Sequence, residues 1–210
     1  DIGCGLGGGD IVLARDLGAN VVGIDLEAPL IARAQAYVDA ASLSDRISLR
    51  QVAPGPLDFP DASFDVVYSS GAFTQTQDKA GMFAEVFRVL KPGGASTSYD
   101  WMGIDQPHSA DMLHWFEVEG LTYALETLPG HARLLEGAGF TQVTVRDDEG
   151  WYTQEAQNEY DLLDGPMKDE ALRLLGPDQY QHFLDDWSAM LTVLRKGELI
   201  PAYFRGIKPA

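Results

Sequence analysis

Short apolar runs alternate with segments of helical spacing along this chain. Residues 20–25 (NVVGID) and 64–69 (FDVVYS) are short, apolar and rich in valine, which is typical of buried parallel strands. Over residues 79–90 the apolar positions instead recur every three or four residues, which indicates a helix with one buried stripe. The same reasoning predicts strands at 20–25, 46–52, 64–69, 95–101, 141–147 and 200–207. It predicts helices at 11–17, 30–41, 79–90, 112–125, 131–138, 151–163 and 178–196.

This alternation predicts an α/β fold with a mainly parallel, Rossmann-like sheet and helices on both faces. A glycine-rich loop normally follows a buried strand, yet the chain opens on such a loop at residues 1–10. We therefore expect one further strand before residue 1, giving seven strands with the last one antiparallel. Helices are expected as an insertion after the fifth strand, at 95–101, and residues 1–210 are expected to form a single domain.

The glycine-rich opening carries the first chemical signal. Gly3, Gly5 and Gly8 satisfy the pattern G-x-G-x-x-G, and Asp25 follows Gly8 by 17 residues. Glycines let the backbone approach a ligand, and the following helix offers free N–H groups. An acidic residue at the end of the next strand can accept hydrogen bonds from both hydroxyls of a ribose. The pattern predicts a cofactor that contains a nucleoside, and by itself it does not distinguish NAD from S-adenosylmethionine.

Three further features separate these two cofactors. Asp1 directly precedes the glycines, where its charge would repel a pyrophosphate but can hold an ammonium group. FPDASFDVVYS at 59–69 covers the fourth strand, and a KPGG turn at 91–94 precedes the fifth. With GID at 23–25, these motifs resemble the class I S-adenosylmethionine-dependent methyltransferases over nearly the whole chain. The resemblance implies S-adenosylmethionine as the cofactor.

The small-amine N-methyltransferases, which include the phosphoethanolamine and sarcosine/dimethylglycine enzymes, are a closer match. The similar segments are DIGCGLGGGD, VVGIDL, EGAGFTQVTV and the ending AYFRGIKP. The resemblance implies an active site roofed by the segments after the fourth and fifth strands. The N-terminal lid of this family is expected before residue 1, together with the first strand.

Carried over residue by residue, the resemblance assigns the cofactor side of the site. Asp25 would hold the ribose and Leu26 would pack on the adenine. Ala53 stands where the family has an aspartate that contacts the adenine amino group, so that hydrogen bond is missing or comes from elsewhere. The full set of expected cofactor-binding residues is Asp1, Gly3, Gly5, Asp25, Leu26, Ala53, Ser69 and Ser70.

At the positions expected to bind the methyl acceptor, the sequence departs from the pattern of the phosphoethanolamine enzymes. Ser70 replaces an arginine and Gln75 replaces a catalytic histidine, and no basic residue for a phosphate is evident near Gly197. Glutamine cannot act as a base near pH 7, but it can orient an amine. Trp101 stands where a tyrosine is expected, and Tyr123 aligns with a tyrosine of the acceptor pocket. We expect Gln75 and Tyr123 to act in catalysis and Trp101 and Tyr123 to bind the acceptor.

Composition narrows the range of partners. Fifteen basic against 32 acidic residues give a formal net charge of −17, which disfavours nucleic acids and anionic membrane surfaces. The single cysteine, Cys4, excludes an internal disulfide and a multi-cysteine metal site, and no pair among the four histidines has metal-ligand spacing. No membrane-length apolar run or signal peptide is visible, so we expect a cytoplasmic protein that acts on a small molecule. The oligomeric state stays open.

The sequence therefore predicts methyl transfer from S-adenosylmethionine to a small molecule, with an amine nitrogen as the favoured acceptor and oxygen or carbon left open. Two alternatives use the same loop. The first is an NAD-dependent oxidoreductase, against which Asp1 and the KPGG turn argue. The second is a methyltransferase-like binding module without catalysis, for which the changes at Ala53, Ser70 and Gln75 argue.

Overall fold

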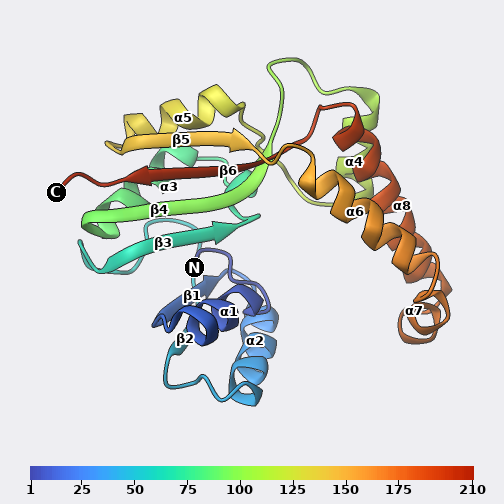
Figure 1. The fold of residues 1–210 in the computed structure, drawn as a ribbon, viewed down its shortest axis with the longest axis horizontal. Coiled ribbons are helices and arrows are strands. Elements are labelled where there is room, and N and C mark those ends of the chain that lie inside the picture. The colour runs from blue at the N-terminus through green and yellow to red at the C-terminus, as the bar shows by residue number, and fades with distance from the viewer.

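Six strands form the sheet of the computed structural model, which describes residues 1–210 (Figure 1). Two pairs are parallel, β1 with β2 and β3 with β4, while β6 runs antiparallel to both β4 and β5. The strands are β1 (Val21–Asp25), β2 (Ile47–Gln51), β3 (Phe64–Ser70), β4 (Leu90–Met102), β5 (Thr141–Asp147) and β6 (Ile200–Ile207).

A single residue joins the two parts of the sheet. Ile2 forms parallel bridges to Ile24 on one side and to Ser69 on the other. The strand order is therefore β2-β1-Ile2-β3-β4-β6-β5. All six strands predicted within residues 1–210 are present, and Ile2, after which the backbone turns at Gly3 (φ +74°), occupies the position between β1 and β3. The seventh strand, expected before residue 1, stays a prediction. The antiparallel last strand is confirmed.

Each predicted helix is present; 151–163 has both predicted ends, and the others are shifted at one or both ends. The predicted helix at 112–125 stops at Glu119, because Gly120 takes a left-handed conformation (φ 73°) and caps it. The turn η1 (Phe73–Gln75) and the helix α7 (Lys168–Leu175) are additional to the prediction. The remaining helices are α1 (Gly8–Leu17), α2 (Ala28–Ala40), α3 (Lys79–Val89), α4 (Ala110–Glu119), α5 (Leu128–Gly137), α6 (Trp151–Leu163) and α8 (Pro177–Arg195).

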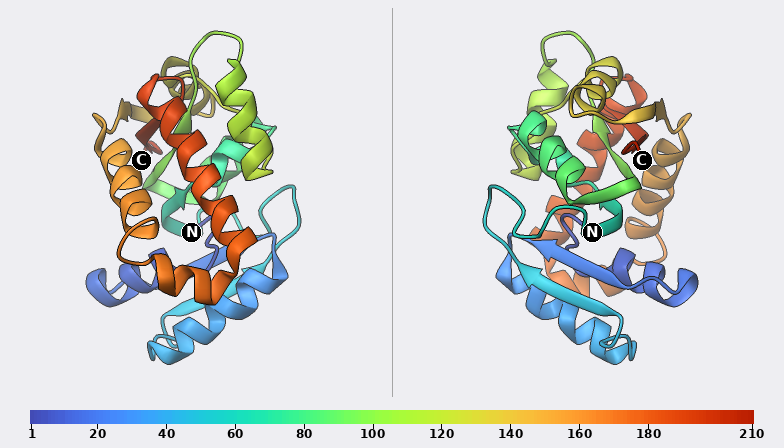
Figure 2. Two further views of the ribbon diagram at one scale, coloured as in Figure 1. Left: turned by 90° about the vertical axis from the view of Figure 1, so that its right-hand side faces the viewer. Right: turned by 90° about the vertical axis from the view of Figure 1, so that its left-hand side faces the viewer.

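The helices divide into three groups. α1 and α2 pack against β1 and β2, and α3 and α5 enclose the main core against the larger part of the sheet. Fully buried Phe83, Leu135 and Phe204 lie in that core. α4, α6 and α8 form a separate unit beyond the carboxyl ends of β3 and β4 (Figure 1). Seen from that side, α8 runs across the front of the sheet between α4 and α6 (Figure 2). None of the helices could serve as a membrane-spanning segment.

Ser109 caps the first helix of this separate unit. Its hydroxyl accepts a hydrogen bond from the Met112 backbone N–H at 3.1 Å. Ser109→Ala is expected to lower the free energy of unfolding by about 1 kcal/mol, since one N–H at the start of α4 then loses its partner. Urea unfolding measures this change. Ser188→Ala, an exposed serine inside α8, is the control and should change stability by less than about 0.5 kcal/mol; equal losses in both variants would contradict the capping role.

Candidate functional site

The glycine-rich loop turns sharply at alternate residues. Gly3, Gly5 and Gly7 have φ values of +74°, +53° and +74°, a region that side chains disfavour. Gly8 is not among these residues and starts α1. Gly3, Gly5 and Gly7 are therefore the residues whose backbone conformation favours glycine, while Gly8, the third glycine of the G-x-G-x-x-G pattern, lies in the helix.

Backbone hydrogen bonds fix this loop between β1 and β3. The N–H groups of Gly3 and Cys4 donate to the Ile24 carbonyl at 2.9 and 3.0 Å, and that of Ile2 donates to the Tyr68 carbonyl at 2.9 Å. A methyl group added at Gly5 would meet no atom within 4 Å, so this face of the loop is open. A ligand can therefore approach the Gly5 backbone next to the amino end of α1.

Asp25 ends β1 directly beside that open face. Its carboxylate accepts hydrogen bonds from Gly5 N–H at 2.8 Å and from Glu27 N–H at 2.9 Å. A carboxylate offers about four acceptor positions, so about two remain for a ligand. Leu26 follows with half of its surface exposed. Exposed Ala53 lies in the next loop, where the N–H of Val52 pairs with the Asp25 carbonyl. The fold thus brings Gly5, Asp25, Leu26 and Ala53 together.

Besides Gly3, the remaining predicted cofactor residues are Asp1, whose backbone pairs with β1, and Ser69 and Ser70 at the end of β3. Asp1 is half-buried, and its Oδ1 is buried without a hydrogen-bond partner, so an acceptor atom is free there. Ser70 is exposed at the end of β3. Ser69, in contrast, is fully buried, and its hydroxyl donates to the Ile2 carbonyl at 2.9 Å. The Ser69 hydroxyl therefore holds the loop, and the expectation that Ser69 lies near the cofactor stays a prediction.

Exposed Gln75 ends the turn after β3, whose other two residues are buried, and a buried aspartate holds that turn in place. Asp100 accepts hydrogen bonds from the N–H of Thr74 at 3.0 Å and from the N–H of Trp101 at 2.8 Å. Burial raises the pKa of Asp100 to about 6, although both hydrogen bonds and the Lys79 ammonium act in the opposite direction. The sequence analysis missed Asp100; the available signal was a charged residue in the segment 95–101, which is otherwise uncharged.

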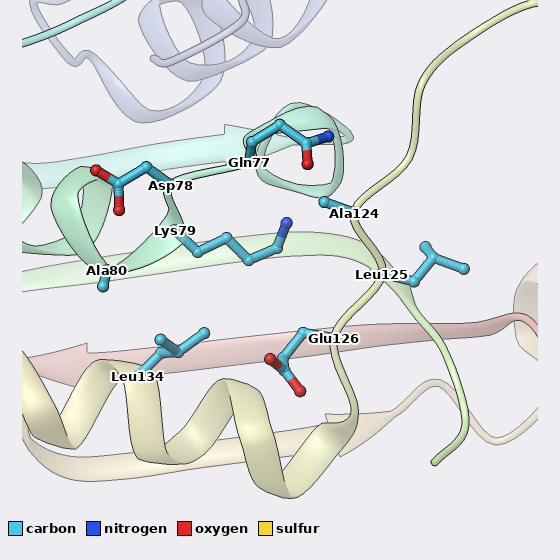
Figure 3. A pocket seen from close by; sticks show the side chains of 8 residues that line it. All are labelled: Gln77, Asp78, Lys79, Ala80, Ala124, Leu125, Glu126 and Leu134. Atoms are coloured by element: carbon cyan, nitrogen blue, oxygen red, sulfur yellow. The ribbon is translucent and has the colours of Figure 1, made fainter. Parts of the chain in front are cut away.

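Lys79 supports the same turn from the other side. It is buried, and its ammonium group donates to the carbonyls of Thr76 at 2.8 Å and Thr74 at 3.4 Å. Burial lowers the pKa of Lys79, while Asp100 and Glu126 raise it. Figure 3 shows Lys79 in the wall of a cavity of about 310 Å³ between the start of α3, the segment 124–126 and α5. The cavity is lined by Gln77, Asp78, Lys79, Ala80, Ala124, Leu125, Glu126 and Leu134.

Tyr123 and Trp101 meet the aromatic residues of the helical unit. The Tyr123 ring stacks on Trp115, with ring centroids 4.8 Å apart and planes at 23°, and its hydroxyl donates to Glu119 at 2.5 Å. Trp101 packs edge-on against Tyr152, with ring centroids 4.7 Å apart. Both predicted acceptor residues are half-buried at the edge of the same cluster of apolar side chains from α4 and α8.

The segment after α4 also contacts the turn that carries Gln75. The N–H of Ala124 donates to the Thr74 carbonyl at 2.8 Å. The fold therefore places Gln75 and Tyr123 on neighbouring segments that are directly hydrogen-bonded. This region lies beyond the carboxyl ends of β3 and β4, on the side of the sheet where the glycine-rich loop ends.

The burial of Asp100 makes stability depend on pH. Its pKa in the folded chain is about 6, against an ordinary value of 3.8, so between these values the native state holds a proton that the unfolded state releases. Deprotonation of Asp100 therefore lowers the free energy of unfolding as the pH rises from about 4 to 6. The free energy of unfolding of the Asp100→Asn variant, relative to that of the unchanged chain, should therefore rise by up to about 2–3 kcal/mol between pH 4 and 7.

Urea unfolding of both proteins at several pH values measures that difference. Asp105→Asn, an exposed aspartate just after β4, is the matched control. A constant difference between the Asp100→Asn variant and the unchanged chain from pH 4 to 7 would contradict a raised pKa of Asp100.

Known proteins resemble this chain in sequence and in fold. Residues 1–97 match a family model described as a methyltransferase domain. Phosphoethanolamine N-methyltransferase 1 of Arabidopsis thaliana is 30% identical over 191 residues, which cover 91% of this chain and 38% of that protein. The chain thus spans well under half the length of this curated relative.

Solved structures match the entire fold. Phosphoethanolamine N-methyltransferase 2 of Haemonchus contortus, in complex with phosphomonomethylethanolamine and S-adenosylhomocysteine, superposes with a TM-score of 0.93 at 22% identity; the match covers 100% of this chain and 48% of the other. The cyclopropane synthase MmaA2 of Mycobacterium tuberculosis superposes with a TM-score of 0.83 at 20% identity, covering 99% of this chain and 76% of the other. One fold therefore accompanies quite different acceptors, so the acceptor has to be argued from the residues of the site.

Proposed function

We propose that the chain transfers a methyl group from S-adenosylmethionine to a small molecule, with an amine nitrogen as acceptor; the match of residues 1–97 to a methyltransferase-domain family supports the transfer. The observation that carries the donor assignment is Asp25. Its carboxylate lies at the carboxyl end of β1, is fixed by two backbone N–H groups, and keeps acceptor positions open beside Gly5. A pair of ribose hydroxyls fits such a carboxylate.

The residues around Asp25 fit the rest of the donor. The exposed side chain of Leu26 offers an apolar surface for a flat base, and the open Gly5 backbone leaves room for the ligand. The buried, unpartnered Oδ1 of Asp1 can accept a hydrogen bond from the donor's ammonium group. When bound, S-adenosylmethionine supplies a methyl group that its sulfonium already activates. The protein then has to align the acceptor and exclude water.

The acceptor amine must be neutral to use its lone pair. A half-buried surface formed by Trp101 and Tyr123 disfavours the charged form of an amine, while the Glu119 carboxylate, which accepts a hydrogen bond from Tyr123, acts in the opposite direction. The carboxamide of Gln75 can accept a hydrogen bond from that amine and orient it. Burial and the Glu119 carboxylate raise the pKa of Tyr123, so its phenol stays protonated at neutral pH.

An amine screen tests this proposal. The chain is incubated with S-adenosylmethionine and a panel of primary and secondary amines, and mass spectrometry detects products that carry one added methyl group. Gln75→Ala should lower kcat about tenfold or more on any amine that reacts, with unchanged affinity for S-adenosylmethionine, because the lost contact only orients the acceptor. Gln179→Ala, an exposed glutamine in α8, is the control.

Either of two outcomes would contradict the proposal. One is binding of S-adenosylmethionine with no methyl transfer to any acceptor, which would favour the binding module. The other is equal kcat for the Gln75→Ala variant and the unchanged chain.

A further inference from the structure

One ammonium group binds the backbone carbonyls on both sides of Gln75. Lys79 Nζ donates a hydrogen bond to the Thr76 carbonyl at 2.8 Å and a longer one to the Thr74 carbonyl at 3.4 Å. Because Thr74 and Thr76 are the chain neighbours of Gln75, these two bonds restrain the backbone before and after it. The side chain of Gln75 is itself exposed, so it can meet a ligand.

The two ends of this turn are held by different groups. At its start, the Thr74 N–H donates to Asp100 at 3.0 Å, and the Thr74 carbonyl also accepts the N–H of Ala124 at 2.8 Å. At its end, the Thr76 carbonyl accepts only the bond from Lys79. Lys79 therefore restrains the end of the turn that Asp100 and Ala124 do not reach.

The position of Lys79 is unfavourable for a lysine. It is the first residue of α3, where the partial positive charge of the helix amino end disfavours a cation. It is 8% exposed and forms no ion pair, so its charge loses hydration without a direct counter-ion. Burial accordingly lowers its pKa, although Asp100 and Glu126 act in the opposite direction. A residue that breaks local rules in this way is expected at a functional site.

Lys208 makes the same kind of contact at the other end of α3. Its ammonium group donates to the carbonyls of Phe87 and Leu90, both at 2.7 Å, where α3 is followed by β4. That place is at the amino end of β4, whereas the turn with Gln75 lies beyond the carboxyl end of β3. Lys208 is therefore a matched example of a lysine that binds backbone carbonyls and has only a structural role.

The direction of the Lys79 side chain agrees with a role in the turn. Figure 3 shows this side chain in the wall of the cavity of about 310 Å³, with its nitrogen towards Ala124 rather than towards Glu126. The ammonium group thus points at the turn. The space beside its methylene groups also lets a different side chain be accommodated there without a clash.

We propose that Lys79 is a positioning residue for the acceptor: its two hydrogen bonds to the turn fix the direction in which the Gln75 carboxamide meets the amine. This inference rests on the proposed methyl transfer and on the part of Gln75 in it. The attacking nitrogen has to lie in line with the bond between the methyl carbon and sulfur, so a small displacement of the orienting group lowers kcat strongly. Binding of S-adenosylmethionine depends on the glycine-rich loop and Asp25, and Lys79 does not contribute to it.

Kinetics of three variants on an amine found in the screen test the proposal. Lys79→Met keeps the length of the side chain without its ammonium group and should lower kcat about tenfold or more. The KM of the acceptor and the Kd of S-adenosylmethionine should stay within about threefold. Lys79→Gln keeps an N–H donor and should have an intermediate kcat; it carries the comparison if the methionine variant does not fold. Lys208→Met is the control, which should lower stability and leave kcat unchanged.

A double-mutant cycle shows whether Lys79 acts through Gln75. Gln75→Ala removes the carboxamide that the turn is proposed to orient. Adding Lys79→Met to this variant should change kcat by less than about twofold, because the positioned group is already absent. Losses that multiply in the double variant would show that Lys79 acts elsewhere and would overturn the inference.

Hydrogen exchange gives a readout that needs no turnover. The N–H groups of Gln75 and Thr76 donate to carbonyls earlier in the same turn, at 3.2 and 3.0 Å. In the Lys79→Met variant these two amides should exchange about tenfold or more faster, because the turn opens more often. In the Lys208→Met variant their exchange should stay as in the unchanged chain. Unchanged exchange or unchanged kcat in the Lys79→Met variant would each overturn the inference.

The proposed methyl transfer can fail separately. If Gln75→Ala lowers kcat and Lys79→Met does not, the positioning role of Lys79 alone fails. If no amine is methylated, or if Gln75→Ala leaves kcat unchanged, the proposed function fails and the positioning role fails with it.

Discussion

Asp25→Ala is expected to weaken the binding of S-adenosylmethionine about a thousandfold. The charged carboxylate would lose two hydrogen bonds to ribose hydroxyls, each contributing about 1.5–3 kcal/mol when one partner is charged. The variant also leaves the N–H groups of Gly5 and Glu27 without their acceptor, so the open face of the loop is less well fixed. Isothermal titration of S-adenosylmethionine into both proteins measures the change.

Two further variants test whether the loss comes from the Asp25 carboxylate. Asp25→Asn keeps one acceptor oxygen and should fall between the alanine variant and the unchanged chain. Asp45→Ala removes an exposed aspartate that makes no recorded hydrogen bond or ion pair and should bind as the unchanged chain does. An Asp25→Ala variant that binds within about twofold of the unchanged chain would rule out Asp25 as the ribose partner.

Gly3→Ala is expected to lower the free energy of unfolding by about 4 kcal/mol. A methyl group at Gly3 would lie 2.4 Å from the Cβ of Ala72, which has no freedom to move away, and the backbone there has φ +74°. Left-handed backbone costs a side chain about 1–2 kcal/mol, and overpacking adds about 1–3 kcal/mol. The loop cannot shift without breaking the hydrogen bonds of Gly3 and Cys4 to Ile24. Thermal or urea unfolding measures the loss.

Gly8→Ala is the matched control from the same motif. A methyl group at Gly8 would meet no atom within 4 Å, and the residue starts a helix. Its stability should therefore be unchanged or slightly higher, because alanine favours helix more than glycine does. Comparable losses at Gly3 and Gly8 would show that the alternating backbone requirement described here is wrong.

The order of strands and helices was predictable from the sequence, since it depends on local periodicity. The resemblance to the class I S-adenosylmethionine-dependent methyltransferases of small-amine type is confirmed by the family match and by the relatives. An antiparallel last strand and a helical insertion after the strand at 95–101 are confirmed as well. The insertion follows from where apolar runs and glycines fall along the chain, whereas the direction of the last strand follows from its pairing in the sheet.

Features that depend on tertiary contacts were not predictable. Gly7 and Gly8 look alike in sequence, and only the path of the loop over Ala34 gives Gly7 its positive φ. The role of Asp100 depends on Thr74, which lies 26 residues away. The apolar cluster that Trp101 and Tyr123 contact joins α4 and α8, whose packing no local pattern predicts. The contributions of Gln75, Tyr123 and Trp101 to the reaction stay predictions.

The central claim is that the glycine-rich loop and Asp25 hold S-adenosylmethionine. Its most direct test is parallel calorimetric titration of S-adenosylmethionine and NAD into the purified chain under the same conditions. We predict saturable binding of S-adenosylmethionine in the micromolar range and no measurable binding of NAD. Binding of NAD without S-adenosylmethionine would contradict the account and would make the loop that of an oxidoreductase.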